Sequence, residues 1–497
     1  MNRTLRKVGI AMIVLVVALL GNLTYNQVVM ADRYRQDPLN QRILFEEATR
    51  LRGQITAADG TILAKSVPSD DQYRYQREYP GGSAYANLTG YYSLRYGPIG
   101  LERSQQDILV GDDPSLLGDR VQDFLTGRDP RGGNVELTIL PAVQQVAYDE
   151  LTAKGYTGAV VAIKPSTGEI LALVSTPSFD PAPFASHSEA VQKKAYNALV
   201  PARDPDPLTN RAVTNLYPPG STFKLVVAAA ALNAGMTPDT SVTSSATITL
   251  PNTGGATLSN FGRESCNGQV GDVTLTEALA HSCNTAFAEV AMSLGADAIR
   301  NQAIALGMDS TESNIGLRVS ASTTGEMADQ AAVAQSGIGQ RDVVTTPLES
   351  AVIAATIANN GVRMTPHLIS RVTAPDLTTV SQTEPEVANP DAIKASVAEQ
   401  LKAMMITTED ATPGAGQIAG LEIASKTGTA EHGTDPKNTP PHTWYVAFAP
   451  AKAPTVAVAV LVENGGDAGL DATGSKVAAP IGRDVLKAAV AAQAAGG

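Results

Sequence analysis

A serine and a lysine stand three residues apart at the head of an apolar run in the middle of the chain. The segment YPPGSTFK places Ser221 and Lys224 directly before the run LVVAAAALNAG. On a helix this spacing puts both side chains on one face, one turn apart. A serine hydroxyl is a weak nucleophile at neutral pH and needs a base beside it. A helix N-terminus and apolar neighbours both favour a neutral lysine, so the pair can form an activated nucleophile.

Taken alone, this S-x-x-K motif is more typical of an N-cap serine followed by a surface lysine. A second motif, Ser-x-Asn, follows it twice, at residues 265–267 and 282–284. The first copy lies in the Gly-rich stretch FGRESCNGQVGD, which indicates a loop. The second copy lies between two helical runs, where a turn can direct a hydroxyl and an amide into a cleft. We therefore assign a functional role to Ser282 and Asn284, and interpret Ser265 and Asn267 as loop residues.

A third motif, Lys-Thr-Gly at 426–428, occurs once and lies in the predicted strand EIASKTGTA. On an edge strand beside the nucleophile, Lys426 and Thr427 can bind a carboxylate, and Gly428 allows a ligand backbone to approach closely. The backbone amide of Thr429 can pair with that of Ser221 as an oxyanion hole. Alone, this motif is an ordinary strand end. The three motifs in this order form a strong signal.

The elements around the motifs predict one α+β domain. The stretch GAVVAIKPSTGEILALVS (158–175) indicates two apolar strands joined by a turn, and strand patterns return at LEIASKTGTA, TWYVAFAPA and TVAVAVLVEN. A helix-rich section lies between them, from 221 to about 359, and a helix at APIGRDVLKAAVAAQA closes the body. Strands at both ends with helices between them indicate an antiparallel sheet covered by helices.

With these motifs the chain resembles the class B penicillin-binding proteins, most of all the actinobacterial PbpA type. The stretches RGQITAADGTILA, YGPIGLE and GIGQRDVVTTPLESAVIAATIANNG are also similar to that family. The resemblance covers nearly the whole chain. It implies a penicillin-binding transpeptidase fold, in which a five-stranded antiparallel sheet flanked by helices is joined to an all-helical subdomain. A single transmembrane helix and a small N-terminal domain rich in strands and loops would precede this body.

The resemblance also implies an activity, the D,D-transpeptidation that cross-links the stem peptides of peptidoglycan. Ser221 would be acylated by the D-Ala-D-Ala end of a donor, with Lys224 as general base. Ser282 would relay a proton to the leaving group, and Asn284 would hold Lys224 and the donor amide. The lysine and threonine of the K-T-G motif would bind the terminal carboxylate. β-Lactams would acylate Ser221 by imitating D-Ala-D-Ala, and no cofactor is implied.

Two other interpretations remain. One is a hydrolase of the same superfamily, a D,D-carboxypeptidase or a β-lactamase, although the E-x-x-L-N motif of class A β-lactamases is absent. The other is a β-lactam sensor or a silent scaffold, although a sensor needs several membrane spans and a scaffold would have lost a motif. An E-D-x-x-F-type glycosyltransferase motif is also absent. The family therefore implies a separate partner, a SEDS-family membrane glycosyltransferase.

The N-terminus predicts a membrane anchor. Three basic residues within the first seven precede an uncharged run from Val8 to Ala31. As a helix, about 23 residues extend about 35 Å, enough to cross a hydrocarbon core of about 30 Å. The basic side should remain cytoplasmic. Because no small-residue cleavage site follows the apolar centre, we expect an uncleaved anchor and a single-pass protein of the cell membrane with an extracellular catalytic body.

The predicted division of the chain follows from these features. It comprises a cytoplasmic tail at 1–7, an anchor at 8–30, a non-catalytic pedestal or dimerisation-like domain at 31–134 and a transpeptidase domain at 135–491. The charged, Pro/Gly-rich segment LTGRDPRGG (125–133) is a predicted linker between the last two.

Composition narrows the possible ligands. The net charge of −12 argues against nucleic acid, because no basic face is available to neutralise phosphates. A metal site is poorly supported, since the five histidines are scattered and neither HExxH nor paired CxxC occurs. The two cysteines, Cys266 and Cys283, can form a disulfide in an exported protein or remain as buried thiols, and the sequence leaves both options open.

Overall fold

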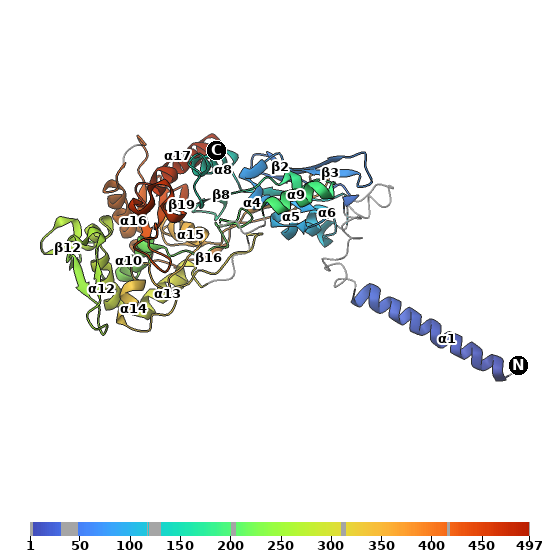
Figure 1. Ribbon diagram of the computed structural model, residues 1–497, viewed down its shortest axis with the longest axis horizontal. Coiled ribbons are helices and arrows are strands. Elements are labelled where there is room, and N and C mark those ends of the chain that lie inside the picture. The colour runs from blue at the N-terminus through green and yellow to red at the C-terminus, as the bar shows by residue number, and fades with distance from the viewer. Residues whose placement is uncertain are drawn as a thin grey trace.

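The computed structural model describes residues 3–30, 48–116, 118, 131–199, 205–309, 315–414 and 418–496. Helix α1 (Arg3–Thr24) continues into a π-helical turn, η1 (Tyr25–Val29), and extends away from the folded body (Figure 1). Its apolar segment, Arg6–Val29, is long and apolar enough to cross a membrane, and none of its residues is buried. This helix corresponds to the anchor predicted at 8–30.

A five-stranded antiparallel sheet forms the centre of the body, in the order β17-β18-β19-β7-β8. Its strands are β7 (Gly158–Ile163), β8 (Ile170–Thr176), β17 (Ala424–Ala430), β18 (His442–Ala449) and β19 (Val456–Val462). The hairpin β7–β8 and the three late strands lie where the apolar patterns predicted them. Because β19 pairs with β7, strands from both ends of the body close one sheet.

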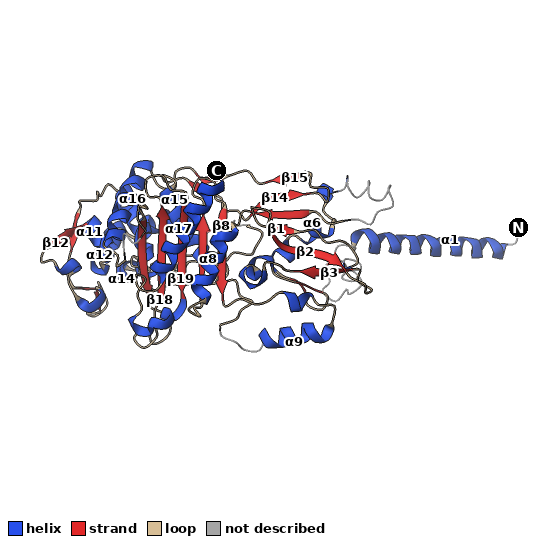
Figure 2. Cartoon of the chain, turned by 90° about the horizontal axis from the view of Figure 1, so that it is seen from above, coloured by secondary structure: helices blue, strands red, loops and turns tan. Residues whose placement is uncertain are grey.

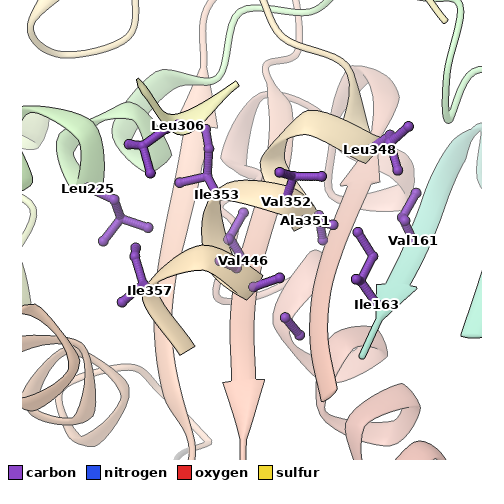
Figure 3. Packing of buried hydrophobic residues seen from close by; sticks show 14 of the residues in the cluster. Val161, Ile163, Leu225, Leu306, Leu348, Ala351, Val352, Ile353, Ile357 and Val446 are labelled. Carbon is purple, nitrogen blue, oxygen red and sulfur yellow. The ribbon is translucent and has the colours of Figure 1, made fainter. Parts of the chain in front are cut away.

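Helices cover both faces of this sheet (Figure 2). One face carries α8 (Pro141–Thr152) and α17 (Ala478–Gly496). The other face carries α15 (Pro347–Ala358), whose residues are buried except for Glu349. Figure 3 shows α15 between the sheet residues Val161, Ile163 and Val446 and the subdomain residues Leu225 and Leu306. A helix that is apolar on nearly every side requires such a position.

The helix-rich insertion is joined to the sheet through α16 (Ala395–Asp410), which packs against both β17 and α10 (Lys224–Asn233). It also contains α11 (Leu275–Ala280), α12 (Asn284–Leu294), α13 (Ala296–Leu306) and α14 (Gln330–Ser336). The prediction of an all-helical subdomain was wrong, because two ribbons lie within it. These are β9 (Ser241–Thr243) with β12 (Asp272–Thr274), and β10 (Thr247–Thr249) with β11 (Thr257–Ser259). Their Thr- and Val-rich segments have the β-branched composition of short strands.

A second sheet has six strands in the order β15-β14-β6-β1-β2-β3. These are β1 (Ile55–Thr56), β2 (Ile62–Pro68), β3 (Tyr75–Glu78), β6 (Asn134–Leu137), β14 (Ile369–Thr373) and β15 (Thr379–Gln382). The segment AADG (57–60) forms the turn that joins β1 to β2, with Gly60 at a φ of +83°. The sheet crosses the predicted boundary at residue 134, because β14 pairs with β6. The linker predicted at 125–133 lies mostly outside the described residues.

Short elements complete the structure around these sheets. They are α4 (Ala86–Thr89), β4 (Tyr92–Ser93), β5 (Gly97–Pro98), α5 (Gly100–Ser104), α6 (Gln106–Val110), α9 (Glu189–Leu199), β13 (Arg363–Met364) and β16 (Val387–Asn389). Helix α5 carries a fully buried acid, Glu102, which lies between two buried arginines. The Glu102 carboxylate accepts from Arg52 Nε at 2.5 Å, from Arg77 Nε at 2.7 Å and from the Tyr79 hydroxyl at 3.2 Å. This cluster fastens α5 to β3 and to the segment before β1.

Candidate active site

The candidate nucleophile lies on a sharp corner before α10. Ser221 is in a 3-10 turn, η5 (Gly220–Phe223). The sequence suggested a helix that begins at the serine, but the α-helix begins at Lys224. Residues three apart are eclipsed in a 3-10 turn, and Lys224 Nζ lies 3.1 Å from Ser221 Oγ. Gly220 has a φ of +53°, and a Cβ there would lie 2.7 Å from the Thr429 carbonyl oxygen. Only glycine permits this contact between the turn and β17.

Lys224 is fully buried and holds the centre of the site. Its Nζ donates to the Ser282 carbonyl oxygen and to Asn284 Oδ1, both at 2.7 Å, and lies 3.3 Å from Ser282 Oγ. Among the residues that the structure describes, none of the hydrogen-bond partners of Lys224 Nζ is a carboxylate. Burial, together with the positive charge of Lys426, lowers the pKa of Lys224 well below its ordinary value. A neutral amine beside Ser221 can accept the hydroxyl proton.

The second Ser-x-Asn motif forms the turn between α11 and α12, as predicted. Ser282 has a φ of +57°, a left-handed conformation that costs energy for a residue other than glycine and often marks a functional site. A hydrogen bond joins this turn to β11, because Asn284 Nδ2 donates to the Ser259 carbonyl oxygen at 3.1 Å. The first copy of the motif, including Ser265 and Asn267, lies in the loop around a 3-10 turn, η7 (Cys266–Gly268), and none of its atoms bonds Lys224.

The two cysteines are joined in a disulfide, with their Cα atoms 5.5 Å apart. The bridge spans 17 residues and links the loop of the first Ser-x-Asn copy to the turn of the second. A loop of that length corresponds to about 3 kcal/mol of stabilisation in the chain-entropy view. Since Cys283 stands between Ser282 and Asn284, the bridge braces the turn that presents both side chains.

The Lys-Thr-Gly motif lies on β17, the edge strand of the central sheet. Lys426 is fully buried, and its Nζ donates to Ser282 Oγ and to the Thr427 carbonyl oxygen, both at 3.0 Å. Burial lowers the pKa of Lys426 to about 7. A Cβ on Gly428 would lie 2.9 Å from the Pro219 carbonyl oxygen. Glycine is therefore required there for packing against the nucleophile corner, a reason that differs from the ligand approach predicted from sequence.

Ser282 Oγ lies between the two lysines, 3.3 Å from Lys224 Nζ and 3.0 Å from Lys426 Nζ. The structure thus brings together all three predicted motifs, including Thr429, which follows them on β17. Thr429 Oγ1 accepts from the Gly474 amide at 3.4 Å. The continuous contacts from Ser221 through Lys224 to Ser282 provide a route by which a proton can move.

Sequence inspection missed the side chains that support the nucleophile corner. Trp444, which is fully buried on β18, donates from Nε1 to the Pro218 carbonyl oxygen at 3.0 Å. The Tyr217 hydroxyl donates to Glu463 at 2.6 Å, and Arg211 pairs with the same carboxylate at 3.0 Å. Trp444 and Glu463 lie more than 200 residues after the corner, so no local spacing indicated this contact. The single tryptophan of the chain was the one available signal.

Comparisons with known proteins agree with this arrangement. The family described as "Penicillin binding protein transpeptidase domain" matches residues 158–487, about two thirds of the chain. The chain belongs to the penicillin-binding protein transpeptidase family. A second family of penicillin-binding proteins, described as "Penicillin binding protein A dimerisation domain", matches residues 52–135.

Among penicillin-binding proteins, the chain is similar to two named relatives. It is 53% identical to the peptidoglycan D,D-transpeptidase PbpA of Mycolicibacterium smegmatis, over 99% of each chain. It is 50% identical to the protein of the same name from Mycobacterium tuberculosis H37Rv, again over 99% of each. The solved penicillin G acyl-enzyme complex of M. tuberculosis penicillin-binding protein A superposes with a TM-score of 0.85, at 50% identity over 89% of this chain and 100% of that chain.

Proposed function

We propose that this protein is a peptidoglycan D,D-transpeptidase that cross-links stem peptides through an acyl-enzyme on Ser221. β-Lactams inhibit it by acylating the same hydroxyl. The observation that carries the proposal is the buried Lys224 amine, 3.1 Å from Ser221 Oγ, in contact with both side chains of the Ser-x-Asn turn. The names of the relatives favour the transpeptidase over the hydrolase and sensor interpretations.

Acylation begins with loss of the Ser221 proton to Lys224 Nζ. The Ser221 oxygen forms a bond to the carbonyl carbon of the penultimate D-Ala of the donor stem, and the carbonyl oxygen becomes negatively charged. The backbone amides of Ser221 and Thr429 stabilise that charge as an oxyanion hole. The close approach of Gly220 to the Thr429 carbonyl supports this pairing, because it brings η5 and β17 side by side.

Breakdown of the tetrahedral intermediate breaks the D-Ala-D-Ala peptide bond. The proton held on Lys224 passes through Ser282 Oγ to the nitrogen of the departing terminal D-Ala. The 3.3 Å contact between Lys224 Nζ and Ser282 Oγ supports this transfer. Asn284 fixes Lys224 and the donor amide, while Lys426 and Thr427 bind the terminal carboxylate. In the second half of the reaction, an amine of another stem attacks the carbonyl carbon of the ester and forms the cross-linking amide bond. The amine proton passes by way of Lys224 to the Ser221 oxygen, which leaves as the free hydroxyl.

The same proposal includes the placement of the chain. Residues 1–7 are cytoplasmic, 8–30 span the membrane and the catalytic body lies outside; the apolar helix at Arg6–Val29 supports this arrangement. The N-terminal domain comprises residues 31–134 and the transpeptidase domain comprises residues 135–491. Strands β14 and β15, which come from the transpeptidase part of the sequence, complete the sheet of the N-terminal domain. A SEDS-family glycosyltransferase is the proposed partner, supplying the glycan strands that this chain cross-links.

The direct test uses the full-length protein in detergent, incubated with benzylpenicillin and followed by intact-mass spectrometry and peptide mapping. We expect one stable adduct on Ser221, absent from the Ser221→Ala variant. Incubation with a pentapeptide stem and an amine acceptor should then give a cross-linked product with release of one D-Ala. Rapid loss of the adduct with hydrolysed penicillin would instead identify a hydrolase, and no adduct at all would overturn the proposal.

The two perturbed lysines predict a bell-shaped pH dependence for acylation by benzylpenicillin. As the pH rises, Lys224 loses its proton and becomes a base, so the second-order rate constant rises. Above about pH 7 the rate should fall, because Lys426 loses the charge that holds the penicillin carboxylate, at its pKa of about 7. Stopped-flow rates from pH 5 to 10 measure both limbs.

The Lys426→Arg variant separates the two causes of this profile. A guanidinium keeps its charge throughout the range, so the falling limb should disappear while the rising limb remains. A falling limb at an unchanged pH in this variant would show that another group causes it.

A further inference from the structure

The side of β17 that faces away from the active site carries a second buried polar cluster. Side chains alternate along a strand, so Ser425 and Lys426 point to opposite faces of the sheet. Lys426 reaches Ser282 on the active-site face, whereas the Ser425 hydroxyl donates to the Glu409 carboxylate. Glu409 is in the last turn of α16. Ser425, the residue immediately before the K-T-G motif, is therefore hydrogen-bonded to Glu409 on the face of the sheet opposite the active site.

We call Ser425, Glu409, Tyr445 and Arg483 the Glu409 cluster. Besides the Ser425 hydroxyl, Glu409 Oε2 accepts the Tyr445 hydroxyl at 3.0 Å, and Oε1 accepts Arg483 Nε at 2.7 Å. Each of the four residues is 5% exposed or less. The cluster joins β17, β18, α16 and α17, and Arg483 extends it by donating from Nη1 to the Pro413 carbonyl oxygen at 3.1 Å.

The buried Glu409 carboxylate is satisfied within the cluster. The charge of Arg483 compensates the buried carboxylate, and both carboxylate oxygens accept hydrogen bonds. Burial and the Glu409 charge raise the pKa of Tyr445 well above its ordinary value, so its hydroxyl keeps the proton that it donates. Gly482 leaves room for this ring, since a Cβ there would lie 2.3 Å from Tyr445 Cδ1. No member of the cluster bonds Ser221, Lys224 or Ser282.

The position of β17 matters because of how Lys426 is held. Among the described residues, its Nζ bonds only Ser282 Oγ and the carbonyl oxygen of its own neighbour, Thr427. Neither partner is charged, so no ion pair fixes the lysine. As an edge strand, β17 has a strand neighbour on one side only. A shift of its backbone would move Lys426 away from Ser282 and from the carboxylate of a substrate.

We propose that Ser425 is a positioning residue, through which the Glu409 cluster holds the K-T-G strand where Lys426 reaches Ser282 and the substrate carboxylate. This inference rests on the proposed function. It assigns a catalytic consequence to a hydrogen bond on the opposite face of the sheet from the reacting atoms. The same carboxylate oxygen also bonds Tyr445 on β18, which carries none of the three motifs, and that provides a matched control.

The test compares Ser425→Ala with Tyr445→Phe in the full-length protein. Each variant removes one neutral hydroxyl from Glu409 Oε2 and leaves the Glu409–Arg483 pair intact, so both are expected to fold and to lose similar thermal stability. Saturation kinetics with benzylpenicillin separate the dissociation constant of the first complex from the rate of acylation. Ser425→Ala should weaken the first complex about 10-fold, the size expected for a disturbed hydrogen bond to a charged group, and should also slow acylation. Tyr445→Phe should change either constant less than about 3-fold.

Equal losses in the two variants would overturn the inference, because they would report general destabilisation rather than the position of Lys426. A Ser425→Ala variant with wild-type constants would overturn it too. Failure of the wild-type protein to form a Ser221 adduct would be a different result, since it would overturn the proposed function and this inference with it.

Discussion

Replacing Lys224 by methionine is expected to lower the rate of Ser221 acylation by benzylpenicillin about 10²- to 10⁴-fold, the loss typical of removing a positioned general base. Methionine keeps the length and apolar stem of the side chain but cannot accept a proton. The hydroxyl proton of Ser221 then has no acceptor at the 3.1 Å contact. Stopped-flow acylation rates measure the loss, and circular dichroism checks that the variant is folded.

Lys402 provides the matched control for this substitution. It is also a buried lysine, 6% exposed on α16, but it pairs with Glu399 away from the three motifs. Lys402→Met should acylate at a rate within about 3-fold of the wild type. If Lys224→Met retained a rate within 10-fold of the wild type, Lys224 would not be the base, and the route from Ser221 to Ser282 would need another acceptor.

The largest effect on stability is expected in the N-terminal domain. Glu102→Gln should lower the free energy of unfolding by about 3–5 kcal/mol, because it leaves Arg52 and Arg77 as uncompensated buried charges. Burial by itself would raise the pKa of Glu102, but the charges of the two arginines outweigh it and lower the pKa. The stabilisation is therefore present at neutral pH and is lost as the pH falls through the pKa of the folded state. Urea denaturation measures the difference.

Glu78→Gln is the control for that experiment, because Glu78 forms an ion pair with Lys65 in the same domain, at 3.5 Å, and is 45% exposed. Exposed pairs contribute about 0–1 kcal/mol, so this variant should be nearly neutral. If Glu102→Gln were equally neutral, the cluster would be held by packing rather than by charge compensation.

Much of the catalytic domain could be predicted from local patterns. The uninterrupted apolar runs of β7, β8 and β19 and the three short motifs each occupy a continuous stretch, and the structure brings the motifs together as expected. The i+3 spacing of Ser221 and Lys224 fits an α-helix and a 3-10 turn equally well. That is why the sequence located the pair correctly but placed the start of the α-helix three residues too early.

What the sequence could not predict depends on pairing between distant segments. Trp444 supports Pro218 across 226 residues, and Glu409 on helix α16 reaches Ser425 on strand β17. The short ribbons β9–β12 and β10–β11 consist of three-residue strands, which are too short to leave a clear alternation among helices. In each case the partner lies in another segment of the sequence and is brought close only by folding, so the residues next to each position do not indicate the contact.

The strand order of the six-stranded sheet determines when this sheet can be completed during synthesis of the chain. Asn134 on β6 bonds Thr373 on β14, a partner that the ribosome adds 239 residues later. Until then β6 carries an unpaired edge, which can pair with the wrong strand or with another chain. The N-terminal sheet is therefore completed after most of the catalytic domain has been synthesised, and a nascent chain halted before residue 369 would keep that edge open.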